Sequence, residues 1–323
     1  MLKRRQNRVA ESRMTLPVVM TYAIAIWMLS GTLLPDVPIT SDGLLGGAWV
    51  QFACFLVSVY LLVELNNGNA LIRIFSRSIS CSFIILTCAA NFLFENMGGA
   101  IAALCYVAFY AMLFHSYQDK QATGWTFYAF LCIGLCSTVF IQILYFLPLL
   151  WLIMFFQLSS FSGRTFVASI LGLITPYWFL LPIAIWQGQT DLLPAHFMKL
   201  ADFPLPGDYS QLAIGQILVL LFVVGLGITG IVHFKRNQSA DNIRIRLLYG
   251  CFIQLWCVTF LLLCVQPQHF DVLLRLLIIN TAPLIGHFLA LTHTRVTNIA
   301  FHVIVAIALL LTILNLWMPS LTF

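Results

Sequence analysis

An uncharged run of thirty-five residues constrains how this chain can fold. The run extends from residue 124 to residue 158 and contains no Asp, Glu, Lys or Arg. A single α-helix of this length measures roughly 50 Å, whereas the hydrocarbon core of a bilayer is about 30 Å thick. Two antiparallel helices of about 17 residues each fit the short end of the membrane-spanning range. We therefore compare a single crossing with a hairpin of two short crossings.

The composition is that of an integral membrane protein. Hydrophobic residues make up 61% of the sequence, charged residues make up 8%, and the mean hydropathy is +0.96. Soluble domains contain about 25% charged residues. The net charge of +5 is better explained by basic cytoplasmic loops than by a nucleic-acid partner. We predict an all-α, polytopic transmembrane helix bundle whose main partner is the lipid bilayer.

The apolar runs predict about eleven membrane-spanning helices when the uncharged run is counted as a hairpin. They lie near residues 15–34, 46–63, 78–94, 99–115, 124–140, 142–158, 166–186, 211–233, 247–265, 273–291 and 299–319. The first run follows a basic segment, residues 1–14, and is too long for the hydrophobic part of a signal peptide. We expect a retained signal-anchor helix with the N-terminus in the cytoplasm.

The basic residues distinguish the hairpin from the single crossing. With the hairpin, fourteen basic residues fall on the cytoplasmic side and only Lys199 and Arg275 fall outside. With a single crossing the distribution is nine against seven. Because cytoplasmic loops carry an excess of Lys and Arg, the charges favour the hairpin, with its tip around residues 141–145 outside. The predicted topology is a single membrane domain, residues 1–323, with its C-terminus in the periplasm.

The longest predicted outer loop extends from residue 187 to residue 210 and contains three prolines. Leu192, Leu193, Phe197 and Leu200 can form one face of a short helix that lies in the membrane interface. A connector held by its prolines is an equally good interpretation. Prolines inside predicted spans tend to kink their helices and favour a cavity nearby. These are Pro148, Pro176, Pro182 and Pro283.

Two segments carry a resemblance to a known family. They are Gly124 to Trp151, with Phe130, Gly134-Leu135 and Phe146-Leu147-Pro148, and, after the basic Arg164, the segment Gly172-Leu173-Ile174-Thr175-Pro176-Tyr177-Trp178-Phe179. Over about residues 105–185 the chain resembles a family of multi-span membrane proteins of Bacteroidota that has no established function. The resemblance implies a bacterial inner-membrane protein, and it supplies no catalytic residues.

A looser similarity is to the polyprenyl-phosphate-sugar-dependent membrane glycosyltransferases, which start inside and place an acidic residue in the first outer loop. Here that loop, LPDVPITSDGLL, contains Asp36 and Asp42. The similarity implies that one of these residues is a catalytic base. The loop has only twelve residues, whereas the enzymes usually build helices into it.

Acidic residues of the outer loops form the first candidate site. They are Asp36, Asp42, Asp191, Asp202 and Asp208. A carboxylate near the membrane surface can act as a base on a sugar hydroxyl or hold a divalent cation beside a lipid phosphate. The alternative is that these residues only solvate their loops. We assign Asp36 and Asp42 as catalytic candidates, and Asp191 and His196 as substrate-binding candidates.

The start of the tenth predicted span forms the second candidate site. Asp271 and Arg275 are spaced to pair on one helix face, and His269 precedes them. Arg275 either binds a phosphate or carboxylate group, or extends to the lipid head groups and is neutralised by Asp271. We assign all three residues to substrate binding.

A third cluster lies on the cytoplasmic side and consists of Glu64, Asn66, Asn67, Asn69, Arg73 and Arg77. We interpret it either as a contact for a partner or anionic lipid, or as a plain connection between helices. The seven histidines and nine cysteines show no spacing typical of a metal site, and no nucleotide-binding glycine motif occurs. We predict neither a metal nor a cofactor.

Three functions remain open. The protein handles a lipid-linked or envelope precursor through an outward-facing cavity, or it is a glycosyltransferase with Asp36 or Asp42 as base, or it is a non-catalytic scaffold for envelope-synthesis enzymes. The predicted spans contain almost no ionisable residues apart from His287 and His302, which argues against ion-coupled transport.

Overall fold

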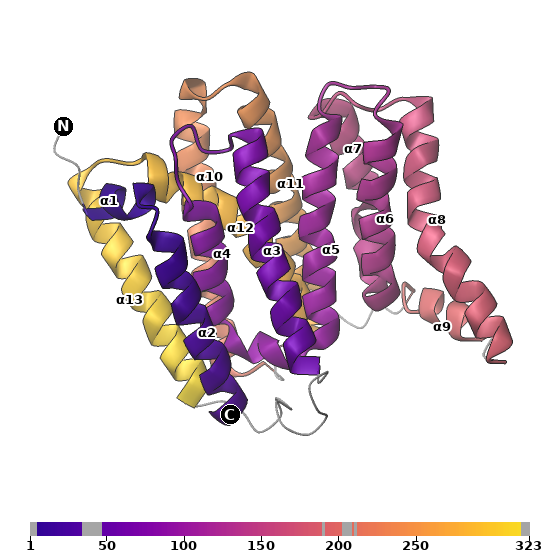
Figure 1. Cartoon of the computed structure of the whole chain (residues 1–323), viewed down its shortest axis with the longest axis horizontal. Helices are drawn as coiled ribbons and strands as arrows, with labels where there is room; N and C mark the ends of the chain where they lie inside the picture. Colours follow the sequence, from indigo (N-terminus) through magenta and orange to yellow (C-terminus); the bar gives the residue numbers. More distant parts are fainter. Residues whose placement is uncertain (1–4, 34–46, 189–190, 202–208, 210–211, 318–323) are drawn as a thin grey trace.

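The computed structural model describes residues 5–33, 47–188, 191–201, 209 and 212–317. These residues form α-helices and short 3-10 helices without a strand, which confirms the all-α prediction (Figure 1). The α-helices are α1 (Arg5–Glu11), α2 (Thr15–Leu33), α3 (Gly47–Asn69), α4 (Ser78–Ala89), α5 (Met97–Leu113), α6 (Thr123–Val139), α7 (Leu147–Phe156), α8 (Gly163–Trp186), α9 (Leu192–Met198), α10 (Ile214–Asn237), α11 (Ile243–Val265), α12 (Phe270–Leu291) and α13 (Arg295–Trp317). Each predicted apolar run overlaps one of these helices.

Seven helices in the described part of the chain are long and apolar enough to cross a bilayer: α3, α5, α8, α10, α11, α12 and α13. Helix α1 and the segment Thr15–Ser30 of α2 meet the same criterion as a pair, with a bend of 86° between them. The shorter apolar helices are Ser78–Ala89, Thr123–Val139 and Ile141–Phe156. The chain is therefore a helical membrane protein, and the count of about eleven spans stays a prediction.

The long helices run between two ends of the bundle (Figure 1). We call the end at which α4, α6 and α11 finish the outer end, and the end at which α3, α5 and α10 finish the inner end, after the predicted topology. Twelve of the fourteen described basic residues belong to the inner end, whereas Lys199 and Arg275 belong to the outer end. In the structure, the basic residues assigned to the cytoplasm and those assigned to the outside thus lie at opposite ends of the bundle.

Helix α12 lies at the centre of the bundle, where it contacts α4, α5, α10 and α11 and is almost completely buried. Polar groups in its middle are paired within the protein. Tyr110 OH donates to Asn280 Oδ1 at 2.6 Å, and Trp256 Nε1 donates to Thr281 Oγ1 at 2.9 Å. Because hydrocarbon offers no hydrogen-bond partners, such pairs fix how α12 is rotated against its neighbours.

The uncharged run folds back on itself. A 3-10 helix over Ile141–Phe146 follows α6, and α7 then returns toward the start of α6. Gln118 N donates to Leu158 O at 2.7 Å, and Ser162 Oγ donates to Lys120 O at 2.9 Å. The segments on either side of the run therefore lie together at the inner end, and the turn lies at the outer end.

Glycines bring α6 and α8 into close contact. A Cβ atom at Gly172 would lie 2.4 Å from Phe127 O, and one at Gly134 would lie 2.7 Å from Leu173 O. Both obstacles are backbone atoms, so no side chain can move aside to make room. Pro176, inside α8, also packs against Gly134. This close crossing positions α8 beside the pocket described next.

Candidate functional site

The predicted binding residues that the structure describes lie at the outer end. Asp36 and Asp42 lie outside the described residues, as do Asp202 and Asp208. The candidates of the longest loop fall in α9 and at its start, and those near the tenth predicted span fall at the start of α12. Asp191 is exposed immediately before α9.

The loop segment predicted as an interfacial helix or a connector is a helix, α9, of seven residues. It lies beside the outer-end half of α8 (Figure 1). The Phe197 ring lies 5.0 Å from the Tyr177 ring of α8. Tyr145 OH, in the turn before α7, donates to Leu200 O at 2.5 Å. These contacts fix α9 against α8 and against the tip of the hairpin.

A pocket of about 340 Å³, which we call the outer pocket, lies between α6, α8 and α9. Leu180 and Ile183 contribute to its apolar wall, and Tyr177, His196 and Lys199 contribute polar groups. Ligand pockets usually combine a mostly apolar lining with a few polar groups that orient the ligand, and their volumes are about 300–1,000 Å³. The outer pocket meets this description.

Hydrogen bonds hold the polar side chains of the outer pocket in place. His196 Nε2 lies 2.8 Å from Ser137 O, and Ser137 Oγ lies 2.7 Å from Tyr177 OH. Because a carbonyl oxygen only accepts, His196 donates through Nε2, and its Nδ1 is the nitrogen that can accept a hydrogen bond or a proton. Together with the ammonium group of Lys199, the pocket contains an acceptor, a hydroxyl group and a cation.

His269 contacts the same part of the hairpin as His196. Its ring lies 5.4 Å from the ring of Phe140, which immediately follows α6. Ser137, the partner of His196, lies three residues before Phe140. The structure therefore brings two of the predicted binding residues to one short segment, residues 137–140.

Arg275 is enclosed by protein. Its guanidinium group donates to the carbonyl oxygen of Leu93 and, at 3.1 Å, to that of Asn96, both in the connection between α4 and α5. The side chain borders a cavity of about 20 Å³, which is room for one water molecule. Asp271, one turn earlier, interacts with it electrostatically. Arg275 therefore joins α12 to the connection between α4 and α5 and does not extend to the lipid head groups.

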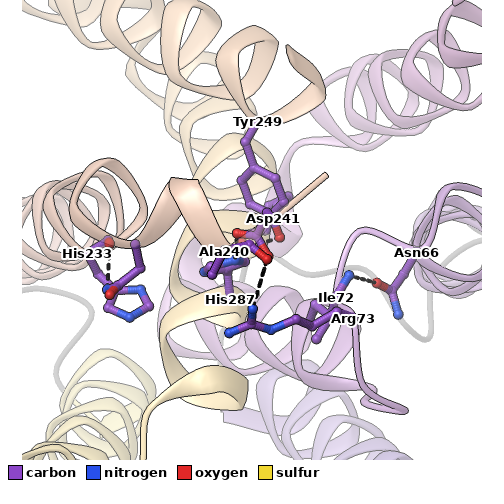
Figure 2. Close-up of polar contacts among 10 residues, drawn as sticks. Asn66, Ile72, Arg73, His233, Ala240, Asp241, Tyr249 and His287 are labelled. Atoms are coloured by element: carbon purple, nitrogen blue, oxygen red, sulfur yellow. Dashed lines mark hydrogen bonds and ion pairs between the residues drawn. The ribbon is translucent and has the colours of Figure 1, made fainter. Parts of the chain in front are cut away.

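A second polar site, the inner-end cluster, consists of Arg73, Asp241 and His287 (Figure 2). Asp241 lies between α10 and α11, and its Oδ2 lies 3.1 Å from His287 Nε2 of α12. Arg73 Nη1 lies 3.9 Å from Asp241 Oδ1 and donates to Ala240 O at 3.0 Å. The side chains of Asp241 and His287 are 2% and 1% exposed, so this pair is removed from water.

The inner-end cluster contains a buried carboxylate–imidazole pair. A carboxylate oxygen accepts, so His287 donates through Nε2, and its buried Nδ1 has no partner among the described residues. The His233 ring lies 5.5 Å from the His287 ring. Buried ionisable groups in membrane proteins often mark functional positions.

Sequence patterns point to individual residues of the inner-end cluster, but they do not show that these residues lie together. Arg73 belongs to the Asn-rich cytoplasmic cluster, and His287 is one of the few ionisable residues inside a predicted span. Asp241 is separated from His287 by 46 positions, so no local spacing links them. The available signal is that Asp241 is the one acidic residue in the basic segment KRNQSADNIRIR.

Comparisons with known proteins give no relative: no family model matches the chain, and no curated protein or solved structure is significantly similar to it. Among the described residues, no three His, Cys, Asp or Glu side chains are grouped as metal ligands. The fold and its polar sites thus define a class, a helical membrane protein with a pocket at one end and a buried ionisable cluster at the other.

Proposed function

We propose that the protein binds an amphiphile with an anionic head group, such as a lipid-linked envelope precursor, in the outer pocket. We further propose that the protein lies in a bacterial inner membrane, that it crosses this membrane about eleven times, and that its outer end faces the periplasm. The observation that carries it is the convergence of Tyr177, His196 and Lys199 on a mostly apolar pocket. An amphiphile requires both the polar groups and the apolar wall, because its head group needs polar partners and its chain needs apolar contacts.

The surface around the outer pocket supports entry from the bilayer. Trp178, Phe179 and Trp186 of α8 are strongly exposed. Exposed aromatic side chains are enriched where the head groups of a membrane meet its hydrocarbon core. The apolar pocket residues Leu180 and Ile183 belong to the same stretch of α8. A molecule dissolved in the bilayer can therefore reach the pocket along α8.

The polar side chains favour a phosphate-type head group. Lys199 is one of only two described basic residues at the outer end, and Arg275 already donates to backbone carbonyl groups. Lysine binds phosphate as a compact point charge.

Binding of farnesyl phosphate to the protein purified in detergent micelles tests this proposal, with farnesol as the uncharged comparison. A hydrogen bond to a charged group contributes about 1.5–3 kcal/mol, so we expect farnesyl phosphate to bind roughly ten- to a hundredfold more tightly than farnesol. Lys199→Gln should reduce the affinity for farnesyl phosphate to that for farnesol. Isothermal titration calorimetry measures both affinities.

Two further variants complete the experiment. Ala184→Phe places a large side chain in the pocket wall and should weaken binding of both ligands. Lys235→Gln removes a basic residue at the inner end and should change neither affinity. Equal affinities for the two ligands, or unchanged binding in both Lys199→Gln and Ala184→Phe, contradict the proposal and favour the scaffold function. The glycosyltransferase alternative stays a prediction, because Asp36 and Asp42 lie outside the described residues.

A further inference from the structure

Helix α1 forms an elbow with α2 and lies at one edge of the inner end of the bundle, against α12 and α13 (Figure 1). Gln6 Nε2 donates to Leu289 O at 2.7 Å and to Thr292 Oγ1 at 2.8 Å. Asn7 Nδ2 donates to Thr292 O at 3.0 Å. The last carbonyl groups of a helix have no partner within it, so these amides complete the C-terminal end of α12. Helix α1 is thereby fixed to the bundle.

A groove lies between α2 and α13 on the inner-end side of a contact between these helices. At that contact, Tyr22 OH lies 2.7 Å from Thr312 Oγ1. The groove, which we call the inner groove, has a volume of about 470 Å³. Residues of α1, α4 and α12 also line it, including Cys81 of α4 and Leu289 of α12. It is therefore enclosed by helices on several sides.

The lining of the inner groove is mostly apolar, and its charged side chain lies at the end next to the elbow, which we call the polar end. Arg8 and Ser12 line the end next to the elbow. Val18, Ile85 and Val305 line the part farther along α2, α4 and α13. In the predicted topology the polar end lies at the level of the lipid head groups and the apolar part lies at the level of the acyl chains.

Two arginines give the polar end a positive charge. Arg8 lines the groove directly. Arg77 immediately precedes α4 and interacts electrostatically with Cys81 of the groove wall. Its Nη1 is buried without a hydrogen-bond partner among the described residues, and its guanidinium carbon lies 5.5 Å from the centre of the Phe75 ring. Glu11 is the acidic residue of α1, so arginines outnumber acids here.

We propose that the inner groove binds an anionic phospholipid of the inner leaflet, with its phosphate at Arg8 and Arg77 and an acyl chain between α2 and α13. Arginine pairs with phosphate oxygens through two parallel hydrogen bonds. A zwitterionic lipid has the same phosphate but also a choline cation, which two arginines repel, so the site favours the anionic head group. Along α4 the groove extends from Ser78 to Ile85, which is about 10 Å of helix. This length accommodates the part of one acyl chain that lies next to the head group. The inner groove is separate from the outer pocket, so this proposal does not depend on the proposed function.

Native mass spectrometry of the purified protein tests the lipid site, with dimyristoylphosphatidylglycerol and dimyristoylphosphatidylcholine competing at equal concentrations. The two lipids have the same chains, so only their head groups differ in charge. We expect the wild-type protein to retain phosphatidylglycerol with at least about a tenfold preference, and the Arg8→Gln/Arg77→Gln variant to lose that preference. Val305→Phe fills the apolar part of the groove and should reduce retention of both lipids.

Matched variants separate this site from the general lipid-facing surface. Arg295→Gln removes an exposed arginine at the start of α13, and Val303→Phe enlarges an exposed residue of α13 outside the groove. Neither should change lipid retention. Equal retention of the two lipids by the wild-type protein overturns the proposal, as does unchanged retention in Val305→Phe. Displacement of phosphatidylglycerol by excess inorganic phosphate also overturns it, because the site would then recognise a soluble anion.

Discussion

The Asp241 carboxylate is a buried charge with two basic neighbours, His287 at 3.1 Å and Arg73 at 3.9 Å. Removing charged groups from water is costly, and the cost is recovered only while the partners remain in place. His287→Leu leaves the carboxylate without its nearest partner. We expect a loss of about 3–5 kcal/mol in the free energy of unfolding. Unfolding of the purified protein in mixed detergent micelles measures this change.

The double variant Asp241→Leu/His287→Leu is the informative comparison. Replacing both members of a buried pair by apolar residues is often close to neutral, so the second substitution should restore most of the lost stability. His302→Leu, at an exposed position of α13, should change stability by less than about 0.5 kcal/mol. A double variant whose loss equals or exceeds that of His287→Leu alone would show that the pair is not the origin of the effect.

At the scale of elements, the contact between α6 and α8 depends on glycines. Gly172→Ala places a methyl group 2.4 Å from the backbone oxygen of Phe127, so the helices must move apart. Overpacking of this kind costs about 1–3 kcal/mol. Gly225→Ala in α10 is the matched control, because a Cβ there meets nothing within 4 Å. A thermal unfolding comparison in which both variants behave alike would contradict this description of the contact.

The apolar runs predict the helices well because each run is long and has at most one charged residue, so it forms a helix in a bilayer independently of its neighbours. They do not predict every boundary. The run at residues 78–94 ends as a helix at Ala89, and Asn91 in the next turn donates its side-chain amide to Thr312 O of α13 at 3.0 Å. Helix α1 is not predicted, because Gln6 is buried there by hydrogen bonds to α12, to α13 and to Thr292 between them, all far away in the sequence.

The candidate sites were predictable to different degrees. Helix α9 and His196 follow from one loop, where an apolar face and a histidine are close in sequence. The hydrogen-bond partners of Arg275 could not be predicted from the nearby sequence, because they are Leu93 and Asn96, about 180 positions earlier. Apolar helices offer many similar faces to one another, so their pairing depends on details such as Gly172 rather than on hydrophobic periodicity.

At the scale of the whole molecule, the two ends of the bundle differ in charge and in the sites they carry. The outer end contains the outer pocket with His196 and Lys199, and the inner end contains the inner groove and the cluster around Asp241. The functional proposals assign these ends to opposite sides of the membrane. The turn of the hairpin is a poor reporter of its side, because Gln142 is only 6% exposed. Exposed positions at the two ends are better reporters.

Single cysteines in a variant with its nine native cysteines replaced test the central claim, that the outer end faces the periplasm. Gln268→Cys reports the outer end and Lys120→Cys reports the inner end, and both positions are exposed. In intact bacterial cells, a membrane-impermeant maleimide should label Gln268→Cys. It should label Lys120→Cys only after the membrane is permeabilised. The reverse pattern would place the outer pocket in the cytoplasm and contradict the account.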